Sequence, residues 1–270
     1  MHKIIFFIGF YLTTVLVQGA EVDTVLTTSK SMNKAIKAVV IRPTNDDEKK
    51  EMPVVYLLHG YSGNYADWIK KVPAIKRLAD QYQFIIVCPD GGFSSWYFDS
   101  PIDDNFKYET YIVDELIPFI DQKYKTVKSR EGRAITGLSM GGHGALYLSF
   151  RHQDLFGAAG SMSGGVDIRP FPSNWDLAKR LGMQAEHADL WEKYTVTNML
   201  YLLIPNRLSI IIDCGTGDFF YNVNEQLHHK LLDRNIPHDY ITRAGVHNWD
   251  YWANSIQYQL LFMHRFFVAE

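Results

Sequence analysis

The stretch Gly137-Leu138-Ser139-Met140-Gly141 has the pattern Gly-x-Ser-x-Gly. It follows a short apolar run at 133–136, typical of a strand, and precedes a segment at 142–152, typical of a helix. A serine in a tight turn between a strand and a helix has its hydroxyl exposed above the sheet, and flanking glycines let the neighbouring backbone pass close. The pattern predicts that Ser139 is a nucleophile. The alternative is a glycine-rich turn in which Ser139 only caps the helix.

A serine hydroxyl becomes a good nucleophile when a histidine takes its proton and a carboxylate holds that histidine. The apolar run 208–212 is followed by two candidate acids, Asp213 and Asp218. We expect Asp218 to be the acid, because a glycine turn precedes it and can aim it inward. Asp213, at the strand end, is expected to bond local backbone amides. The alternative for Asp218 is a cap on the following helix.

Ten histidines compete for the role of base, and chain order separates them. In a sheet of this type the triad runs serine, acid, histidine along the chain, and the histidine follows the last strand. His247 comes just after the apolar run 240–242, so we expect it to be the base. Four other histidines are expected to lie within helices or at the start of a strand: His143, His228, His229 and His238.

Attack on an ester carbonyl also requires hydrogen-bond donors for the oxyanion that develops. We expect one from the backbone N–H of Met140, next to the nucleophile, and one from the backbone N–H of Tyr61, in the loop after an earlier strand. His59 is expected to bond the backbone of that loop. A thiol nucleophile is disfavoured, because both cysteines lie in or at the end of apolar runs with no activating motif.

Apolar runs and helical stretches alternate along the chain, which predicts an α/β fold: a mostly parallel twisted sheet of about eight strands with helices on both faces. Two runs, 22–28 and 35–41, are expected to form a pair of edge strands. The run Val54–Leu58 has no polar face, as expected of a strand covered on both sides. Further strands are expected at 84–87, 133–136, 157–160, 208–212 and 240–242, and helices at 108–121, 142–152 and 225–235.

Two segments depart from this alternation. Residues 1–20 hold Lys3, an apolar run at 4–17 and then small residues, which predicts a secretory signal peptide. The run is shorter than the roughly 20 residues of a membrane span. Residues 21–270 are expected to form one domain, secreted or periplasmic, with a partly helical insertion at about 165–205.

Composition excludes several other classes of function. Lys and Arg total 27 against 30 for Asp and Glu, a net charge of -3, so there is no basic footprint for nucleic acid. No Cys/His cluster has zinc spacing, and the two cysteines are too few for a disulfide scaffold. We expect no nucleic-acid partner, no metal, no cofactor and no membrane contact after signal cleavage; the partner is the substrate alone, a polysaccharide or a small ester.

Several motifs together resemble the esterase D group of α/β-hydrolases, over nearly the whole mature chain. This group comprises serine esterases that include feruloyl and acetyl xylan esterases of the carbohydrate esterase family 1 type, S-formylglutathione hydrolases and mycolyltransferases. Carried over by motif, the resemblance implies an α/β-hydrolase fold and the triad Ser139, Asp218 and His247, with Tyr61 and Met140 as oxyanion donors. The motifs are Leu57-Leu58-His59-Gly60, Pro89-Asp90-Gly91-Gly92, Ser95-Trp96-Tyr97, Gly137-Leu138-Ser139-Met140-Gly141-Gly142, Asp213-Cys214-Gly215 and His247-Asn248-Trp249.

The resemblance also implies a strand order that separates Cys88 from Cys214 by about four strand positions. At the usual spacing of strands this is on the order of 19 Å. A disulfide requires Cα atoms within about 7 Å. We therefore expect two free thiols.

The motifs indicate a substrate class less directly. Trp96 and Tyr97 follow a strand end and are expected to border the substrate pocket, since flat aromatic faces pack well on sugars and phenolic acids. The alternative is ordinary loop packing. Trp175 and Trp191, in the insertion, are expected as further contacts.

Secretion favours an external polymer. We expect a secreted serine esterase that hydrolyses acetyl or feruloyl groups on plant polysaccharide such as xylan, through an acyl-enzyme on Ser139. One alternative is a thioesterase of the S-formylglutathione hydrolase type, or a small-ester hydrolase. Another is a non-catalytic module of the same fold that binds a ligand or partner.

Overall fold

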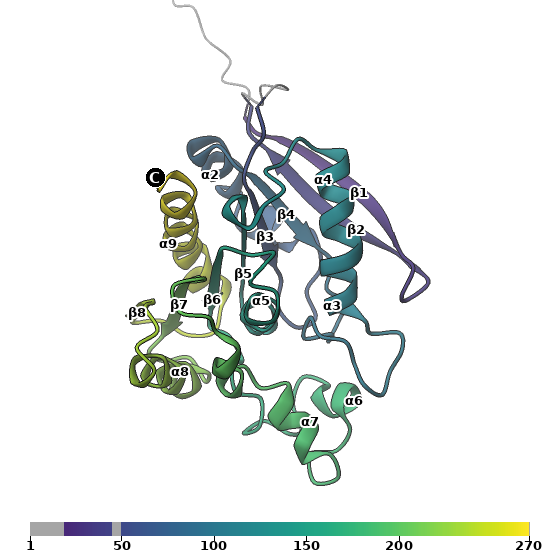
Figure 1. Ribbon diagram of the computed structural model, residues 1–270, viewed down its shortest axis with the longest axis vertical. Coiled ribbons are helices and arrows are strands. Elements are labelled where there is room, and N and C mark those ends of the chain that lie inside the picture. Colours follow the sequence, from purple (N-terminus) through teal and green to yellow (C-terminus); the bar gives the residue numbers. More distant parts are fainter. Residues whose placement is uncertain (1–18, 45–49, 270) are drawn as a thin grey trace, which may run out of the picture.

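A computed structural model describes residues 19–44 and 50–269 of the chain (Figure 1). Of the predicted signal peptide, residues 1–18 lie outside the described residues. In the described part, no helix combines the length and the apolar character that a membrane span requires.

The described residues form one eight-stranded sheet in the order β1-β2-β4-β3-β5-β6-β7-β8. The pairs from β4 to β8 are parallel, whereas β1 with β2 and β2 with β4 are antiparallel. This confirms the predicted α/β-hydrolase architecture. The strands are β1 (Glu21–Ser29), β2 (Lys34–Arg42), β3 (Val54–Leu58), β4 (Ile85–Pro89), β5 (Arg133–Gly137), β6 (Ala158–Met162), β7 (Ser209–Gly215) and β8 (Asp239–Arg243).

One detail of the strand prediction is wrong. Of the two strands expected at an edge, β1 lies at the edge of the sheet and β2 does not, because β2 pairs with β1 on one side and with β4 on the other. The sequence of β2 fits this interior place: Val39, Val40 and Ile41 are consecutive and all buried. A strand covered on both faces needs apolar residues at successive positions.

Helices cover both faces of the sheet (Figure 1). The strand β3 therefore has no polar face, because each of its faces packs in an apolar layer. Val55 and Leu57 belong to the apolar layer that includes side chains of α1, α2 and α9. Tyr56 and Leu58, which point the other way, belong to the layer that includes side chains of α4, α5 and α8. The helices are α1 (Asp67–Lys71), α2 (Ile75–Tyr82), α3 (Tyr108–Thr110), the π-helix η1 (Tyr111–Leu116), α4 (Ile117–Lys123), η2 (Arg130–Gly132), α5 (Met140–Arg151), α6 (Leu177–Leu181), α7 (Ala188–Lys193), η3 (Val196–Asn198), η4 (Leu200–Leu202), α8 (Tyr221–Asp233) and α9 (Trp249–Val268).

The 20-residue helix α9 was not among the predicted helices. Its signal is present in the sequence: four apolar residues at helical spacing, Trp252, Ile256, Leu260 and Met263, are all buried. The Asn248 side chain accepts a hydrogen bond from the backbone N–H of Tyr251, so it caps the start of the helix.

The connection between β6 and β7 carries α6, α7, η3 and η4, and α6 and α7 lie beyond the sheet at the bottom of Figure 1. The sheet order also settles the cysteines. Cys88 in β4 and Cys214 in β7 are four strand positions apart, and both are free and buried, as predicted.

Candidate active site

Ser139 lies in a strained turn between β5 and α5, with φ 55° and ψ −118°. A positive φ is rare for a residue other than glycine and marks a backbone held in place by its surroundings. Here the flanking glycines permit it. A Cβ atom on Gly137 would lie 2.6 Å from backbone atoms of Gly141, and one on Gly141 would lie 2.6 Å from the carbonyl oxygen of His59. The end of β5, the start of α5 and the backbone at His59 can therefore pack this closely only because Gly137 and Gly141 have no side chain.

The structure brings together the three predicted triad residues. The Ser139 hydroxyl donates to Nε2 of His247 over 2.9 Å. On the other side of the ring, Nδ1–H of His247 donates to Asp218, at 2.8 Å from Oδ2 and 3.0 Å from Oδ1. Because a carboxylate only accepts, Nδ1 carries the proton and Nε2 is free to accept one from the serine. This is the arrangement in which a histidine can activate a hydroxyl.

Asp218 and Asp213 differ in the groups they face. Asp218 follows the turn after β7, and its Oδ1 also accepts the backbone N–H of Phe220, which fixes the carboxylate toward His247. Asp213 is fully buried and accepts from Arg243 and Tyr251, and it has no hydrogen bond to a histidine ring of the described residues. The expectation that Asp213 bonds backbone amides is wrong, because two long side chains reach it first.

The two predicted oxyanion donors are free to act as such. Within residues 19–44 and 50–269, neither the backbone N–H of Tyr61 nor that of Met140 has a hydrogen-bond acceptor. Met140 is the first residue of α5, where helix N–H groups lack partners within the helix. His59 holds the loop before Tyr61: its Nε2 accepts the N–H of Gly91 over 2.7 Å, and its Nδ1–H donates to the carbonyl of Gly60 over 2.8 Å.

Three of the competing groups, His143 and the two cysteines, are buried. The ring nitrogens of His143 lie 3.1 Å from the carbonyl oxygen of Trp96 and 3.0 Å from that of Tyr194, and burial lowers the pKa of His143 to about 4. Burial raises the pKa of the Cys88 and Cys214 thiols far above the ordinary value, so neither forms a thiolate near neutral pH.

Ser139 opens into a cavity of about 520 Å³ whose lining includes the aromatic side chains of Tyr61, Trp175, Phe219, Trp249 and Trp252. Asp67 is the one carboxylate, and no Lys or Arg side chain is found among the described residues that line this cavity. Phe219 and Trp249 were not predicted, although each directly follows or nearly follows a predicted triad residue in sequence. The lining residues are Gly60, Tyr61, Ser62, Gly63, Asp67, Leu138, Ser139, Trp175, Phe219, His247, Asn248, Trp249 and Trp252.

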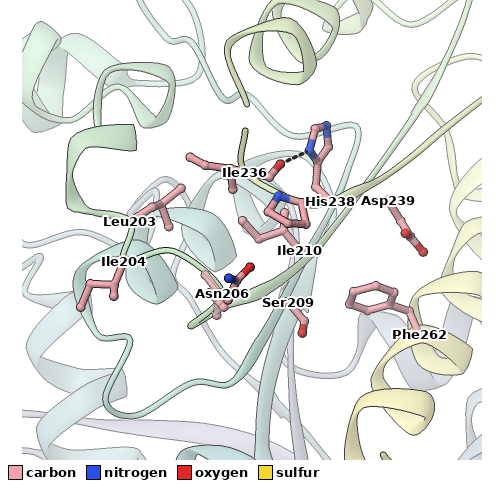
Figure 2. A pocket seen from close by; sticks show the side chains of 11 residues that line it. Leu203, Ile204, Asn206, Ser209, Ile210, Ile236, His238, Asp239 and Phe262 are labelled. Carbon is pink, nitrogen blue, oxygen red and sulfur yellow. Dashed lines mark hydrogen bonds between the residues drawn. The ribbon is translucent and has the colours of Figure 1, made fainter. Parts of the chain in front are cut away.

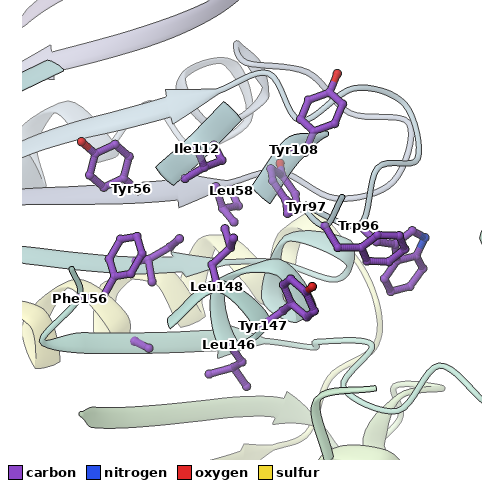
Figure 3. Packing of buried hydrophobic residues seen from close by; sticks show 14 of the residues in the cluster. Tyr56, Leu58, Trp96, Tyr97, Tyr108, Ile112, Leu146, Tyr147, Leu148 and Phe156 are labelled. Carbon is purple, nitrogen blue, oxygen red and sulfur yellow. The ribbon is translucent and has the colours of Figure 1, made fainter. Parts of the chain in front are cut away.

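Trp96 and Tyr97 do not contact this cavity, which corrects their prediction as substrate contacts. They are 1% and 0% exposed, and Figure 3 shows both among the buried hydrophobic residues of the core. The Tyr97 hydroxyl accepts the N–H of His59 over 3.1 Å and lies 3.2 Å from its carbonyl oxygen, so it braces the candidate oxyanion loop. Both residues have positive φ, 55° and 60°.

Of the two tryptophans predicted as substrate contacts in the insertion, one lines the cavity and one does not. Trp175 lines the cavity, whereas Trp191 is fully buried and its indole N–H donates to the carbonyl of Gly182. Trp96 has a supporting role toward the first of these: its Nε1–H donates to the carbonyl of Trp175 over 3.2 Å.

A second cavity of about 260 Å³ lies at the amino-terminal ends of β7 and β8, opposite the ends that carry the triad loops (Figure 2). Its His238 is fully paired: Nδ1–H donates to the carbonyl of Ile236, and Nε2 accepts from Nδ1 of His228, each over 2.8 Å. Neither Ser139 nor a candidate oxyanion donor lines it. Ligands of parallel α/β sheets bind at the carboxyl ends of the strands, which favours the cavity at Ser139.

No group of three or more His, Cys, Asp or Glu side chains suited to a metal ion occurs in the described segments 19–44 and 50–269. The described residues around Ser139 thus offer acid–base and nucleophilic groups, backbone donors and aromatic walls.

Known proteins match this chain along most of its length. The model of the family described as "Putative esterase" matches residues 29–263. The acetyl esterase of Caldicellulosiruptor saccharolyticus is 26% identical over 251 residues, which cover 84% of this chain and 92% of that protein. A ferulic acid esterase of known structure superposes with a TM-score of 0.80 at 28% identity, over 92% of this chain and 98% of the other. An S-formylglutathione hydrolase from Staphylococcus aureus superposes with a TM-score of 0.79 at 20% identity, over 91% of this chain and 99% of the other, a likeness of fold alone.

Proposed function

The chain belongs to the "Putative esterase" family, and from that premise we propose that it is a serine esterase in which Ser139, His247 and Asp218 act as a catalytic triad. The observation that carries the proposal is the continuous hydrogen-bond chain from Ser139 Oγ through both nitrogens of His247 to the Asp218 carboxylate. A protein that only binds a ligand does not require a serine in a strained turn that is hydrogen-bonded to an oriented imidazole.

In the first half of the proposed reaction, Ser139 Oγ attacks the ester carbonyl carbon as its proton passes to Nε2 of His247. The N–H groups of Tyr61 and Met140 bind the oxyanion that forms. The bond from the carbonyl carbon to the alcohol oxygen then breaks, and His247 returns its proton to that oxygen. The alcohol leaves, and the acyl group remains on Ser139.

In the second half, water takes the place of the alcohol. Nε2 of His247 removes a proton from the water as its oxygen attacks the acyl carbon. The bond to Ser139 Oγ breaks, the serine recovers its proton from His247, and the carboxylic acid departs. Asp218 holds the imidazole in the required tautomer and stabilises its charged form throughout.

We propose acetyl or feruloyl esters on plant polysaccharide such as xylan as the substrate of a secreted or periplasmic enzyme. The support is the pattern of a signal peptide in residues 1–20, together with the likeness to an acetyl esterase and to a ferulic acid esterase. The aromatic cavity walls suit both sugars and phenolic acids.

The alternative is a thioesterase of the S-formylglutathione hydrolase type. Glutathione carries two carboxylates and one ammonium group, so its site should contain cationic side chains. Among the described lining residues the charged group beside the triad is Asp67, of the same sign as the carboxylates. The lining therefore favours a neutral ester.

The test compares the protein with its Ser139→Ala variant on 4-nitrophenyl acetate. Loss of the nucleophile should lower kcat/KM by at least about 10⁴-fold, with the far-UV circular dichroism unchanged. Retained turnover in the variant contradicts the proposed nucleophile. Release of acetate or ferulate from acylated xylan oligosaccharides is expected; turnover of S-formylglutathione without such release contradicts the polysaccharide substrate.

A further inference from the structure

Two large apolar side chains are exposed near the candidate active site, and each touches a different part of its machinery. Phe93 is 56% exposed, and its ring lies 4.8 Å from the ring of Tyr61, the residue that offers an oxyanion N–H. Phe219 is 51% exposed, and its ring lies 4.1 Å from the ring of His247. Phe219 lines the cavity at Ser139, and Phe93 does not.

The chemistry of ester cleavage assigns different halves of the substrate to these two places. The carbonyl oxygen must face the N–H groups of Tyr61 and Met140, and the alcohol oxygen must lie within reach of Nε2 of His247, which protonates it. The alcohol half therefore leaves past His247. Two rings that line the cavity pack on that imidazole, those of Phe219 and Trp252, and the exposed one, Phe219, is the wall that the alcohol passes.

Trp175 completes this wall. Its ring lies 5.5 Å from that of Phe219 with an angle of 20° between the planes, and both rings line the cavity. Trp175 also has a positive φ of 47°, a backbone conformation that costs energy for so large a residue. The hydrogen bond from the buried Trp96 to its carbonyl oxygen helps hold it there. The strain is thus used to aim a flat ring at the cavity.

We propose that Phe219 and Trp175 form the subsite for the alcohol half of the ester and set its specificity for a neutral, ring-shaped alcohol such as a sugar residue. Flat apolar faces match the C–H face of a sugar ring, and Asp67 on the same cavity can accept hydrogen bonds from its hydroxyls. The lack of Lys and Arg among the described lining residues disfavours an anionic alcohol. The inference rests on the proposed serine esterase function and deepens it.

The test holds the acyl group constant and varies the alcohol. The substrates are ethyl acetate, phenyl acetate and mono-acetylated xylobiose. In the Phe219→Ala variant, kcat/KM for the two ring alcohols should fall about tenfold more than for ethyl acetate, chiefly through KM. Phe219→Tyr keeps the flat ring and should restore most of the preference.

Phe93→Ala is the matched control, because it removes the same ring from the other end of the site. It should change kcat/KM by the same factor for all three esters. A Phe219→Ala variant that loses activity equally on all three has only displaced His247, and this result overturns the subsite. Such a failure is distinct from failure of the proposed function, in which the unaltered protein cleaves none of the three esters.

Discussion

The strands β7 and β8 have a cavity at each end, and the two cavities differ in how their polar groups are used. At the amino ends, the imidazole of His238 has both nitrogens occupied by Ile236 and His228. At the carboxyl ends, the loops carry Asp218 and His247 and leave Nε2 directed at a serine hydroxyl. A cavity with a histidine is common to both; what differs is whether a nitrogen is directed at a group that can react.

The sharpest way to break this contrast is to remove the base. His247→Ala should lower kcat on 4-nitrophenyl acetate by about 10⁴- to 10⁶-fold, because the serine then has no proton acceptor. Steady-state kinetics measures the loss, and thermal unfolding serves as the control for folding. Activity within tenfold of the unaltered protein contradicts the role of the imidazole.

A second comparison separates the two acids that follow β7. Asp218→Asn should lower kcat by about 10⁴-fold, because an amide no longer fixes the required tautomer of His247. Asp213→Asn should leave kcat within about tenfold. It should lower the free energy of unfolding by about 1–3 kcal/mol, because the amide keeps one acceptor oxygen and no charge where the carboxylate accepts from both Arg243 and Tyr251.

The reverse result, in which Asp213→Asn abolishes turnover and Asp218→Asn leaves it, exchanges the acid and contradicts the geometry. Denaturant unfolding of both variants gives the stability terms that accompany the kinetics.

The brace behind the candidate oxyanion loop should show a smaller effect. Tyr97→Phe removes the hydroxyl that bonds the backbone of His59. We expect a loss of about 1–2 kcal/mol in the free energy of unfolding. Since Tyr61 lies two residues beyond His59, we also expect a several-fold fall in kcat. An unchanged melting temperature together with a raised KM instead indicates a direct substrate contact.

The smallest effect belongs to the other end of the sheet. His238→Gln at the second cavity should change the free energy of unfolding by about 1 kcal/mol or less and leave kcat unaltered. A large fall in kcat in this variant would mean that the second cavity also affects catalysis at Ser139.

The parts of this molecule that depend on chain order and local pattern could be predicted from the sequence. The Gly-x-Ser-x-Gly turn, the candidate acid after β7 and the histidine after β8 follow from the topology of the parallel sheet. The directions of the aromatic side chains do not. Trp96 and Tyr97 are buried, and glycines elsewhere in the chain make room for them; a Cβ on Gly144 would lie 2.6 Å from the side chain of Tyr97.

The pairing of Trp175 with Phe219 could not be predicted either, because one residue lies in the insertion and the other in the loop after β7. Such contacts are set by tertiary packing, and no spacing within one segment reveals them. The helix α9, although not predicted, could have been found from its apolar spacing and its Asn248 cap.

The most direct test of the central claim is to trap the covalent step. The protein is incubated with a fluorophosphonate probe and digested, and the labelled peptide is identified by mass spectrometry, with His247→Ala as the control. We expect one adduct, on Ser139, with labelling strongly reduced in the control. An adduct on another residue, or equal labelling of Ser139 without the imidazole, contradicts the proposed triad.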